Sequence, residues 1–346
     1  MIKVITYFLK ISILSVIMIA QASAGGGRRN GTAGAQELLI PVGARGLAFN
    51  GAYLSGLKGV EAIFYNPAGL AASNLSSEAM FSYMNYIADI GVSYAAIGTQ
   101  FEGFGSLGLS IKSIDFGDIL QTTTQNPYGT GSTFSPTFVT VGITYANSLT
   151  DRIQVGVTGN LISENIISTS ATGIAFNVGV QYSNVVDISG LNFGVVLKNF
   201  GGQITFDGPD LLRQADAINT LRGQQFYKID GAKFELPSQV QLGISYKKNI
   251  NEDYRFLVIG SFDNNNFSND DYKIAGEFAF QETFFLRGGY SYMASPSGQE
   301  EEQLFGSTFG AGFNVNTGID ITVDYAYRSA KYFEANHVFT IKLGIE

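Results

Sequence analysis

The sequence has no cysteine, no tryptophan and a single histidine, His337, among its 346 residues. Without cysteine the chain forms no disulfide framework, no thiolate metal site and no lipoprotein anchor. One histidine cannot build a histidine-based metal cluster. Charged residues are also scarce, at 14% of the chain, against roughly 25% in ordinary soluble domains. These absences argue against a metal enzyme and against an ordinary soluble domain.

Long apolar runs are absent beyond the first residues. Lys3, the apolar run 11–20 and the small residues 22–24 together predict a secretory signal peptide over residues 1–24. That run is too short to span a bilayer, and no later segment approaches the ~18 apolar residues that a transmembrane helix needs. We therefore predict an exported protein without a membrane-spanning helix.

The dominant pattern in the rest of the chain is alternation. Within 174–182, Ile, Phe, Val, Val and Tyr occupy the even positions, and Ala, Asn, Gly and Gln occupy the odd ones. The same period of two returns at 139–145, 153–157 and 339–345, and it is typical of strands with one apolar face. So many amphipathic strands, with no helical domain to cover them, need an apolar surrounding. In an exported protein this favours a membrane β-barrel.

The spacing of the alternating segments predicts fourteen strands. Each is close to the ~9–11 residues that a tilted strand needs to cross a bilayer. The three longest connections, 115–134, 200–238 and 294–304, then fall on one side, and the short ones fall mostly on the other, as in outer-membrane barrels. We predict an all-β fold, a transmembrane antiparallel β-barrel of about 14 strands over residues 76–346. The predicted strands are 76–87, 91–101, 104–114, 135–146, 152–163, 173–182, 191–199, 239–247, 254–262, 272–280, 284–293, 305–315, 319–328 and 337–345.

The segment 25–75 does not alternate. It has many turn-forming residues and scattered apolar ones, and the predicted inward face of the barrel is rich in small residues that leave room for it. We therefore predict that 25–75 forms a plug inside the barrel. The inward glycines are Gly142, Gly156, Gly179, Gly194, Gly243, Gly289, Gly310 and Gly312.

Five short motifs within this segment carry a family resemblance. They are Gly31-Thr32-Ala33-Gly34, Leu38-Leu39-Ile40, Gly43-Ala44-Arg45-Gly46, Gly51-Ala52 and Ala62-Ile63-Phe64-Tyr65-Asn66-Pro67-Ala68-Gly69-Leu70. Their order and spacing resemble the opening of the PorV/PorQ family of outer-membrane proteins, relatives of the FadL-type channels. The chain departs from the family at Phe49-Asn50, where Met-Gly is common, and at Tyr65, where Trp is common.

The resemblance implies a FadL-like barrel with an N-terminal plug in the outer membrane of a Gram-negative bacterium. It also implies a part in type IX protein secretion. In that role the protein would bind the secretion translocon, and cargo proteins with C-terminal signals, at its external face.

Two groups of residues are candidates for holding or moving the plug. Asn66, Pro67, Ala68 and Gly69 predict an Asx-turn that joins plug to barrel, or alternatively a hinge within the plug. Arg45 is the candidate buried charge of the plug, and a buried guanidinium needs carboxylate partners. Inward-facing Glu277, Asp320 and Asp324 are the candidates, either as a static tether or as a latch.

The long connection 200–238 contains an apolar pattern. Pro209 suits a first helical turn, and apolar residues follow at helical spacing. We predict a short external amphipathic helix over 209–222, which either packs on the barrel rim or docks a partner. The residues that define its apolar face are Leu211, Leu212, Ile218 and Leu221.

Catalytic and nucleic-acid-binding signals are nearly absent. The pattern GFGSLG over 103–108 matches a dinucleotide motif but lies at a hairpin, without the βαβ unit that the motif requires. The chain has 29 acidic and 21 basic residues and no basic stripe, so we expect no nucleic-acid partner. We expect no enzyme activity and no cofactor, and outer-membrane lipid as a partner. Two alternatives to secretion stay open: a FadL-like channel for hydrophobic solutes, and a soluble secreted β-sandwich.

Overall fold

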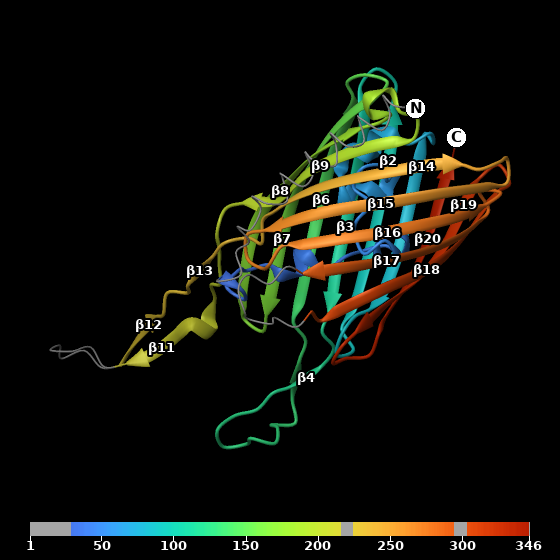
Figure 1. The fold of residues 1–346 in the computed structure, drawn as a ribbon. Helices are drawn as coiled ribbons and strands as arrows, with labels where there is room; N and C mark the ends of the chain where they lie inside the picture. Colours follow the sequence, from blue (N-terminus) through green and yellow to red (C-terminus); the bar gives the residue numbers. More distant parts are fainter. Residues whose placement is uncertain (1–28, 216–223, 294–302, 346) are drawn as a thin grey trace.

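Fourteen antiparallel strands close into one barrel in the computed structural model, which describes residues 29–215, 224–293 and 303–345 (Figure 1). Each strand pairs with the next along the barrel, and the first pairs with the last through Ser77 and Ile345. The predicted strand count is therefore confirmed, and the β-sandwich alternative is wrong. The predicted signal peptide lies outside the described residues. The strands are β1 (Ser77–Asn85), β2 (Gly91–Phe101), β3 (Gly105–Asp115), β6 (Thr137–Ser148), β7 (Ile153–Ile166), β8 (Thr169–Tyr182), β9 (Leu191–Gly201), β14 (Gln239–Asn249), β15 (Tyr254–Asn265), β16 (Asp271–Phe280), β17 (Phe284–Met293), β18 (Phe305–Asn316), β19 (Asp320–Ala330) and β20 (Asn336–Ile345).

The apolar face of the strands points outward. On β8, Ile174, Phe176 and Val178 are 55%, 47% and 45% exposed, whereas Ala175 and Asn177 between them are buried. The same alternation runs around the barrel, so its outer surface is apolar and matches a lipid environment. No helix in the described ranges is both long and apolar enough to cross a bilayer.

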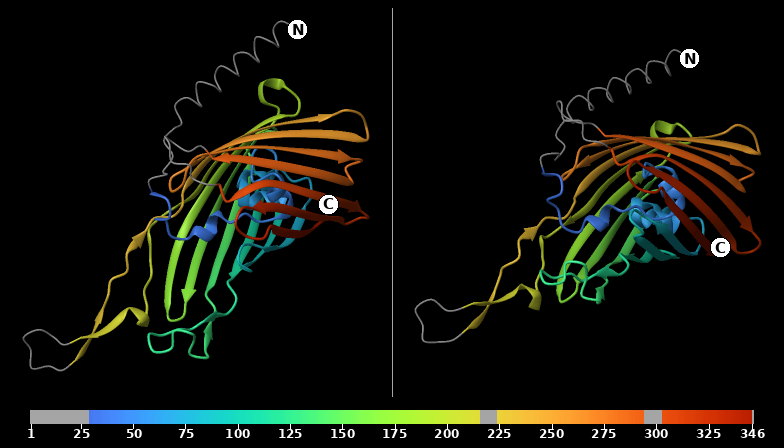
Figure 2. Two further views of the ribbon diagram at one scale, coloured as in Figure 1. Left: turned by 60° about the horizontal axis from the view of Figure 1, so that its bottom comes forward. Right: turned by 90° about the horizontal axis from the view of Figure 1, so that it is seen from below.

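Most of residues 29–75 lie inside the barrel, whereas residues 29–32 are exposed (Figure 2). We refer to these described residues as the plug. Short helices form it because its many glycines and turn residues interrupt any longer element. Six of the eight glycines predicted to face inward abut the plug, since an added Cβ would lie within 3.0 Å of a plug atom. The plug elements are η2 (Gln36–Leu39), α2 (Ala44–Ala48), η3 (Gly59–Glu61), α3 (Ala62–Tyr65) and η4 (Pro67–Ala72).

The long connections all leave one end of the barrel, opposite the end where β1 begins and β20 finishes (Figure 1). We call it the external end, because outer-membrane barrels carry their long loops outside and their short turns in the periplasm. In the connection between β3 and β6, two strands of two residues each, β4 (Ile119–Leu120) and β5 (Thr133–Phe134), form a small antiparallel sheet. A short helix, η5 (Val185–Asp187), occupies a turn at the periplasmic end.

The predicted external helix over 209–222 is wrong for its described part. Only Pro209–Leu211 is helical, as the short η6. Leu212 begins a strand, β11 (Leu212–Ala215), which pairs with β12 (Gln225–Lys228) in a ribbon that projects beyond the barrel. Ile218 and Leu221 lie outside the described residues. A helix needs a surface on which to bury its apolar face, whereas every residue of β11 is exposed.

Candidate functional site

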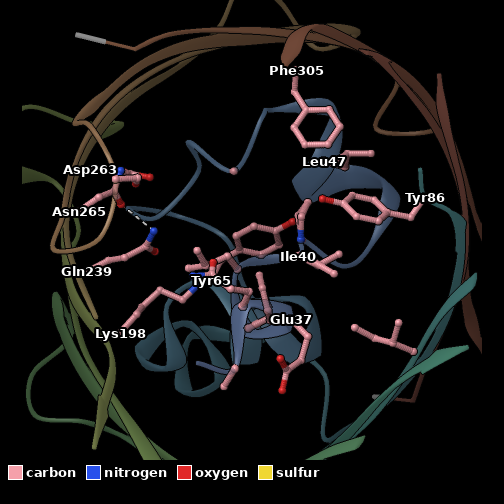
Figure 3. Close-up of a pocket in the computed structure, with 18 of the residues that line it drawn as sticks. Glu37, Ile40, Leu47, Tyr65, Tyr86, Lys198, Gln239, Asp263, Asn265 and Phe305 are labelled. Carbon is pink, nitrogen blue, oxygen red and sulfur yellow. Dashed lines mark hydrogen bonds between the residues drawn. The ribbon is translucent and has the colours of Figure 1, made fainter. Parts of the chain in front are cut away.

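A cavity of about 720 Å³ lies inside the barrel, between the plug and the external end (Figure 3). We call it the lumenal cavity. Its wall comes from the external ends of many strands, and its floor comes from plug residues 35–37, 39–41, 47, 50–51 and 64–65. Cavities of this size are typical of sites for small organic ligands.

One side of the lumenal cavity is apolar and aromatic. Ile40 and Leu47 of the plug face Tyr86, near the end of β1, and Phe305 of β18. Tyr65 lies between this side and the opposite wall, and its hydroxyl donates to the carbonyl of Val42 at 2.8 Å. Because that hydroxyl is already bonded within the plug, the ring presents mainly apolar surface.

The opposite side is polar and largely self-paired. Lys273 Nζ lies 2.6 Å from Asp263 Oδ2, and Gln239 donates to Asn265 at 2.6 Å. Lys198 places its ammonium 4.1 Å from the ring centroid of Phe64, a favourable cation–π arrangement. The cavity thus offers an apolar surface and a polar surface that face each other, which suits a ligand with an apolar body.

Three charged side chains at the lumenal cavity keep buried atoms without a hydrogen-bond partner of opposite charge, and of these side chains only Asp263 forms an ion pair among the described residues, with Lys273. Both carboxylate oxygens of Glu37 are unpartnered in this way, and so is one terminal nitrogen, Nη2, of Arg328. Glu37 and Arg328 are each only 5% exposed. A buried charged group without a hydrogen-bond partner costs free energy. A ligand that forms hydrogen bonds with these atoms would therefore gain the most binding free energy there.

A second cluster of charges lies between the plug and the barrel wall. Glu277 Oε2 is 2.6 Å from Arg287 and 3.7 Å from Arg45, and Glu277 Oε1 is 2.8 Å from Arg255. Arg45 also lies 3.4 Å from Glu61 of the plug. The carboxylate of Glu277 is fully buried and serves three guanidinium groups.

Of the three carboxylates proposed as partners of Arg45, the structure places only Glu277 against it. Asp324 forms its ion pair with Arg287. Asp320 instead accepts hydrogen bonds from Asn314 and Thr322. The inward face of all three was predictable from strand alternation, but their height along the barrel was not. Asp320 is the first residue of β19 and lies four positions before Asp324, closer to the periplasmic end than the charge cluster.

The turn at 66–69 ties the plug to the wall. The side-chain oxygen of Asn66 accepts from the backbone amide of Ala68 at 3.2 Å, which is the Asx-turn that the sequence predicts. Its side-chain nitrogen donates to Leu54 of the plug at 2.8 Å and to Val180 of β8 at 3.1 Å. Pro67 then begins η4 at a position where its missing N–H costs nothing.

The sequence reasoning missed Glu37, Glu61, Arg255, Arg287 and Arg328. Arg255, Arg287 and Arg328 occupy inward positions on predicted strands, so alternation gave a usable signal for them. Glu37 and Glu61 lie in the plug, whose irregular backbone has no period from which a face is assigned.

No protein-family model and no curated protein matches the chain. Solved structures do. The match to a toluene transporter, TodX of Pseudomonas putida, covers 88% of this chain and 98% of the transporter, at 14% sequence identity and a TM-score of 0.56. A FadL homologue of Pseudomonas aeruginosa matches over the same shares at 12% identity and a TM-score of 0.52.

The chain has the FadL-like fold. This is an outer-membrane β-barrel architecture, in agreement with the apolar exterior. The similarity at this level of identity concerns the fold. The proteins compared above are described as a transporter and a FadL homologue, neither of them as an enzyme.

Proposed function

We propose that the chain is a FadL-like outer-membrane channel without enzyme activity, for small solutes with an apolar body. The observation that supports it best is the lumenal cavity, which lies on the external side of the plug and has one aromatic wall. A solute would enter from the external end, bind in this cavity, and reach the periplasm when the plug rearranges. The turn at 66–69 and the ion pair of Arg45 with Glu277 are the connections that such a rearrangement would change.

Filling the lumenal cavity tests this function. We expect Ile40→Trp to lower the affinity for a neutral aromatic solute such as indole by more than about tenfold, because the larger ring occupies the space against Leu47 and Tyr86. Binding is measured by equilibrium dialysis of the purified barrel in detergent, and uptake is measured in proteoliposomes.

The matched control is Ile143→Trp, which adds the same ring on the outer face, where Ile143 is 61% exposed. This variant should bind indole as the parent does. Equal affinity of both variants, with both barrels folded, would contradict the proposed function.

A second candidate function is the type IX secretion component that the N-terminal resemblance implies. The observation that favours it is the β11–β12 ribbon, on which Phe226 and Tyr227 are 71% and 44% exposed. The ribbon is fixed at its base, because Lys228 lies 2.6 Å from Asp207 and lowers the pKa of that carboxyl by its hydrogen bond. Asp207 in turn pairs with Ser170 of β8. Exposed aromatic side chains on a braced ribbon are suited to binding a partner.

If the ribbon binds translocon or cargo, replacing both Phe226 and Tyr227 with Ser should reduce co-purification of that partner roughly thirtyfold, because aromatic anchors at interfaces contribute about 2 kcal/mol or more. The measurement is quantitative pull-down from native membranes in mild detergent. Tyr128→Ser is the control, since Tyr128 is 95% exposed on a different external loop. If the double variant still co-purifies a secreted partner at full yield, the ribbon does not bind that partner.

A further inference from the structure

The lumenal cavity has two opposite poles of unpaired charge. Glu37, at the floor, presents two carboxylate oxygens without a hydrogen-bond partner of opposite charge. Arg328, in the wall, presents the unpartnered Nη2. In Figure 3, Glu37 lies across the cavity from Phe305, and the guanidinium of Arg328 stacks 3.6 Å from the centroid of that ring.

The acidic pole is not neutralised by its neighbours. Glu164 of β7 also lines the cavity, and its carboxyl group is hydrogen-bonded to that of Glu37, so two carboxyl groups and no cation meet at this pole. The nearest cation, Lys112, donates its hydrogen bonds to the backbone carbonyls of Glu37 and Ile40, at 2.7 and 3.3 Å, rather than to the carboxylate. A cationic group in the cavity would therefore gain a pair of carboxyl groups to which no cation of the described chain donates a hydrogen bond.

The basic pole is equally open. Arg328 donates hydrogen bonds from Nε to the side-chain oxygen of Asn336, at 2.9 Å, and to the hydroxyl of Tyr86, and it forms no ion pair among the described residues. Its remaining contacts are aromatic, with Phe305 and, at 5.7 Å, Tyr86. A guanidinium that is stacked on rings and lacks a carboxylate is well placed to bind an anionic group.

We propose that the lumenal cavity binds a zwitterion whose two charges are separated by an apolar body, namely a short peptide of two or three residues with an aromatic side chain. Its ammonium binds Glu37, its carboxylate binds Arg328, and its ring packs between Ile40, Leu47 and Tyr86. Two or three residues span at most roughly 10 Å, a length suited to a cavity of about 720 Å³. This inference rests on the proposed solute function and narrows its substrate class.

The chain itself makes the test direct, because it contains no tryptophan. The fluorescence of a tryptophan-containing ligand can be excited without exciting the protein's tyrosines. The probe is the tripeptide Gly-Trp-Gly, compared with its N-acetylated form, its C-terminal amide and the form with both ends blocked. The four ligands share one body and differ only in end charge. Anisotropy titration of the purified, folded barrel gives each affinity.

We expect the free tripeptide to bind at least about tenfold more tightly than either singly blocked form, and more tightly still than the doubly blocked form, since hydrogen bonds between charged groups are strong where water is excluded. Glu37→Gln should remove only the advantage of a free amino end, and Arg328→Gln only that of a free carboxyl end. Glu252→Gln and Lys248→Gln remove exposed charges at the periplasmic end and should change neither.

Equal binding of the free and doubly blocked tripeptides would overturn the inference, as expected if the two carboxyl groups simply share a proton. Binding of indole with no binding of any tripeptide would overturn it too, while leaving the proposed solute function intact. Binding of neither indole nor tripeptide would overturn both.

Discussion

Glu277→Gln is expected to destabilise the barrel more than any other single charge substitution in the described chain. Among the described residues, Glu277 alone has a carboxylate in contact with all three of Arg45, Arg255 and Arg287. Gln keeps the shape of the side chain but removes the charge, which leaves buried guanidinium groups short of a counter-ion. Breaking a buried ion pair by removing one partner costs about 3–5 kcal/mol. The measurement is the urea midpoint of unfolding in detergent, followed by the mobility shift of the folded barrel on gels.

Glu282→Gln is the matched control. Glu282 also pairs with Arg255, but its side chain is 63% exposed at the periplasmic turn. An exposed ion pair contributes about 1 kcal/mol or less, so this variant should unfold close to the parent. Similar urea midpoints for the two variants would show that burial of Glu277 does not decide its contribution.

The same cluster revises the role predicted for Arg45. Replacing Arg45 with Met leaves Glu277 paired with Arg255 and Arg287, so the plug loses one of several connections rather than its only tether. We therefore expect Arg45→Met to lower the urea midpoint of unfolding less than Glu277→Gln does. Asp324 of β19 pairs with Arg287 of β17 rather than with Arg45, because the two side chains meet on the barrel wall over Gly312 of β18, which has no side chain to separate them.

The sequence predicts those parts of the molecule in which the environment of the residues alternates regularly along the chain. The strands were predictable because Ile174, Phe176 and Val178 face lipid while Ala175 and Asn177 face the lumen, and a period of two records that difference directly. The inward faces of Glu277 and Asp324 follow from the same rule. Their partners do not, because alternation gives the face of a residue but not its height along the barrel.

The lumenal cavity and the ribbon were beyond the sequence for different reasons. The cavity is lined by residues as far apart in the sequence as Glu37 and Arg328, and nothing in the sequence around either residue indicates that they line the same cavity. In the ribbon, Leu211 and Leu212 imitate one face of a helix, but no surface is available to bury that face. The strand pair, in which Leu212 lies opposite Lys228 and Arg213 opposite Tyr227, then satisfies the backbone instead.

Gly179→Val is expected to unseat the plug while leaving the barrel closed. A Cβ at Gly179 would lie 2.0 Å from the side-chain oxygen of Asn66 and 3.0 Å from Pro67. Asn66 cannot retreat without losing its hydrogen bonds to Leu54 and Val180. Overpacking of this kind costs about 1–3 kcal/mol. Because this strain lies at the contact between two parts, it is relieved by movement of the plug rather than by opening of the strand ladder.

The expected readout is tryptic cleavage after Arg45, a bond that the seated plug keeps inside the barrel. A cost of about 2 kcal/mol raises the population of open plug, and hence the cleavage rate, roughly thirtyfold. Gly276→Val is the control, because a Cβ there points to the outer face and meets its nearest neighbour at an ordinary 3.5 Å. Both variants should keep the mobility shift of a folded barrel. If Gly179→Val resists trypsin as well as Gly276→Val does, the plug must accommodate the added side chain without leaving its seat, and the turn at Asn66 is then not what holds it there.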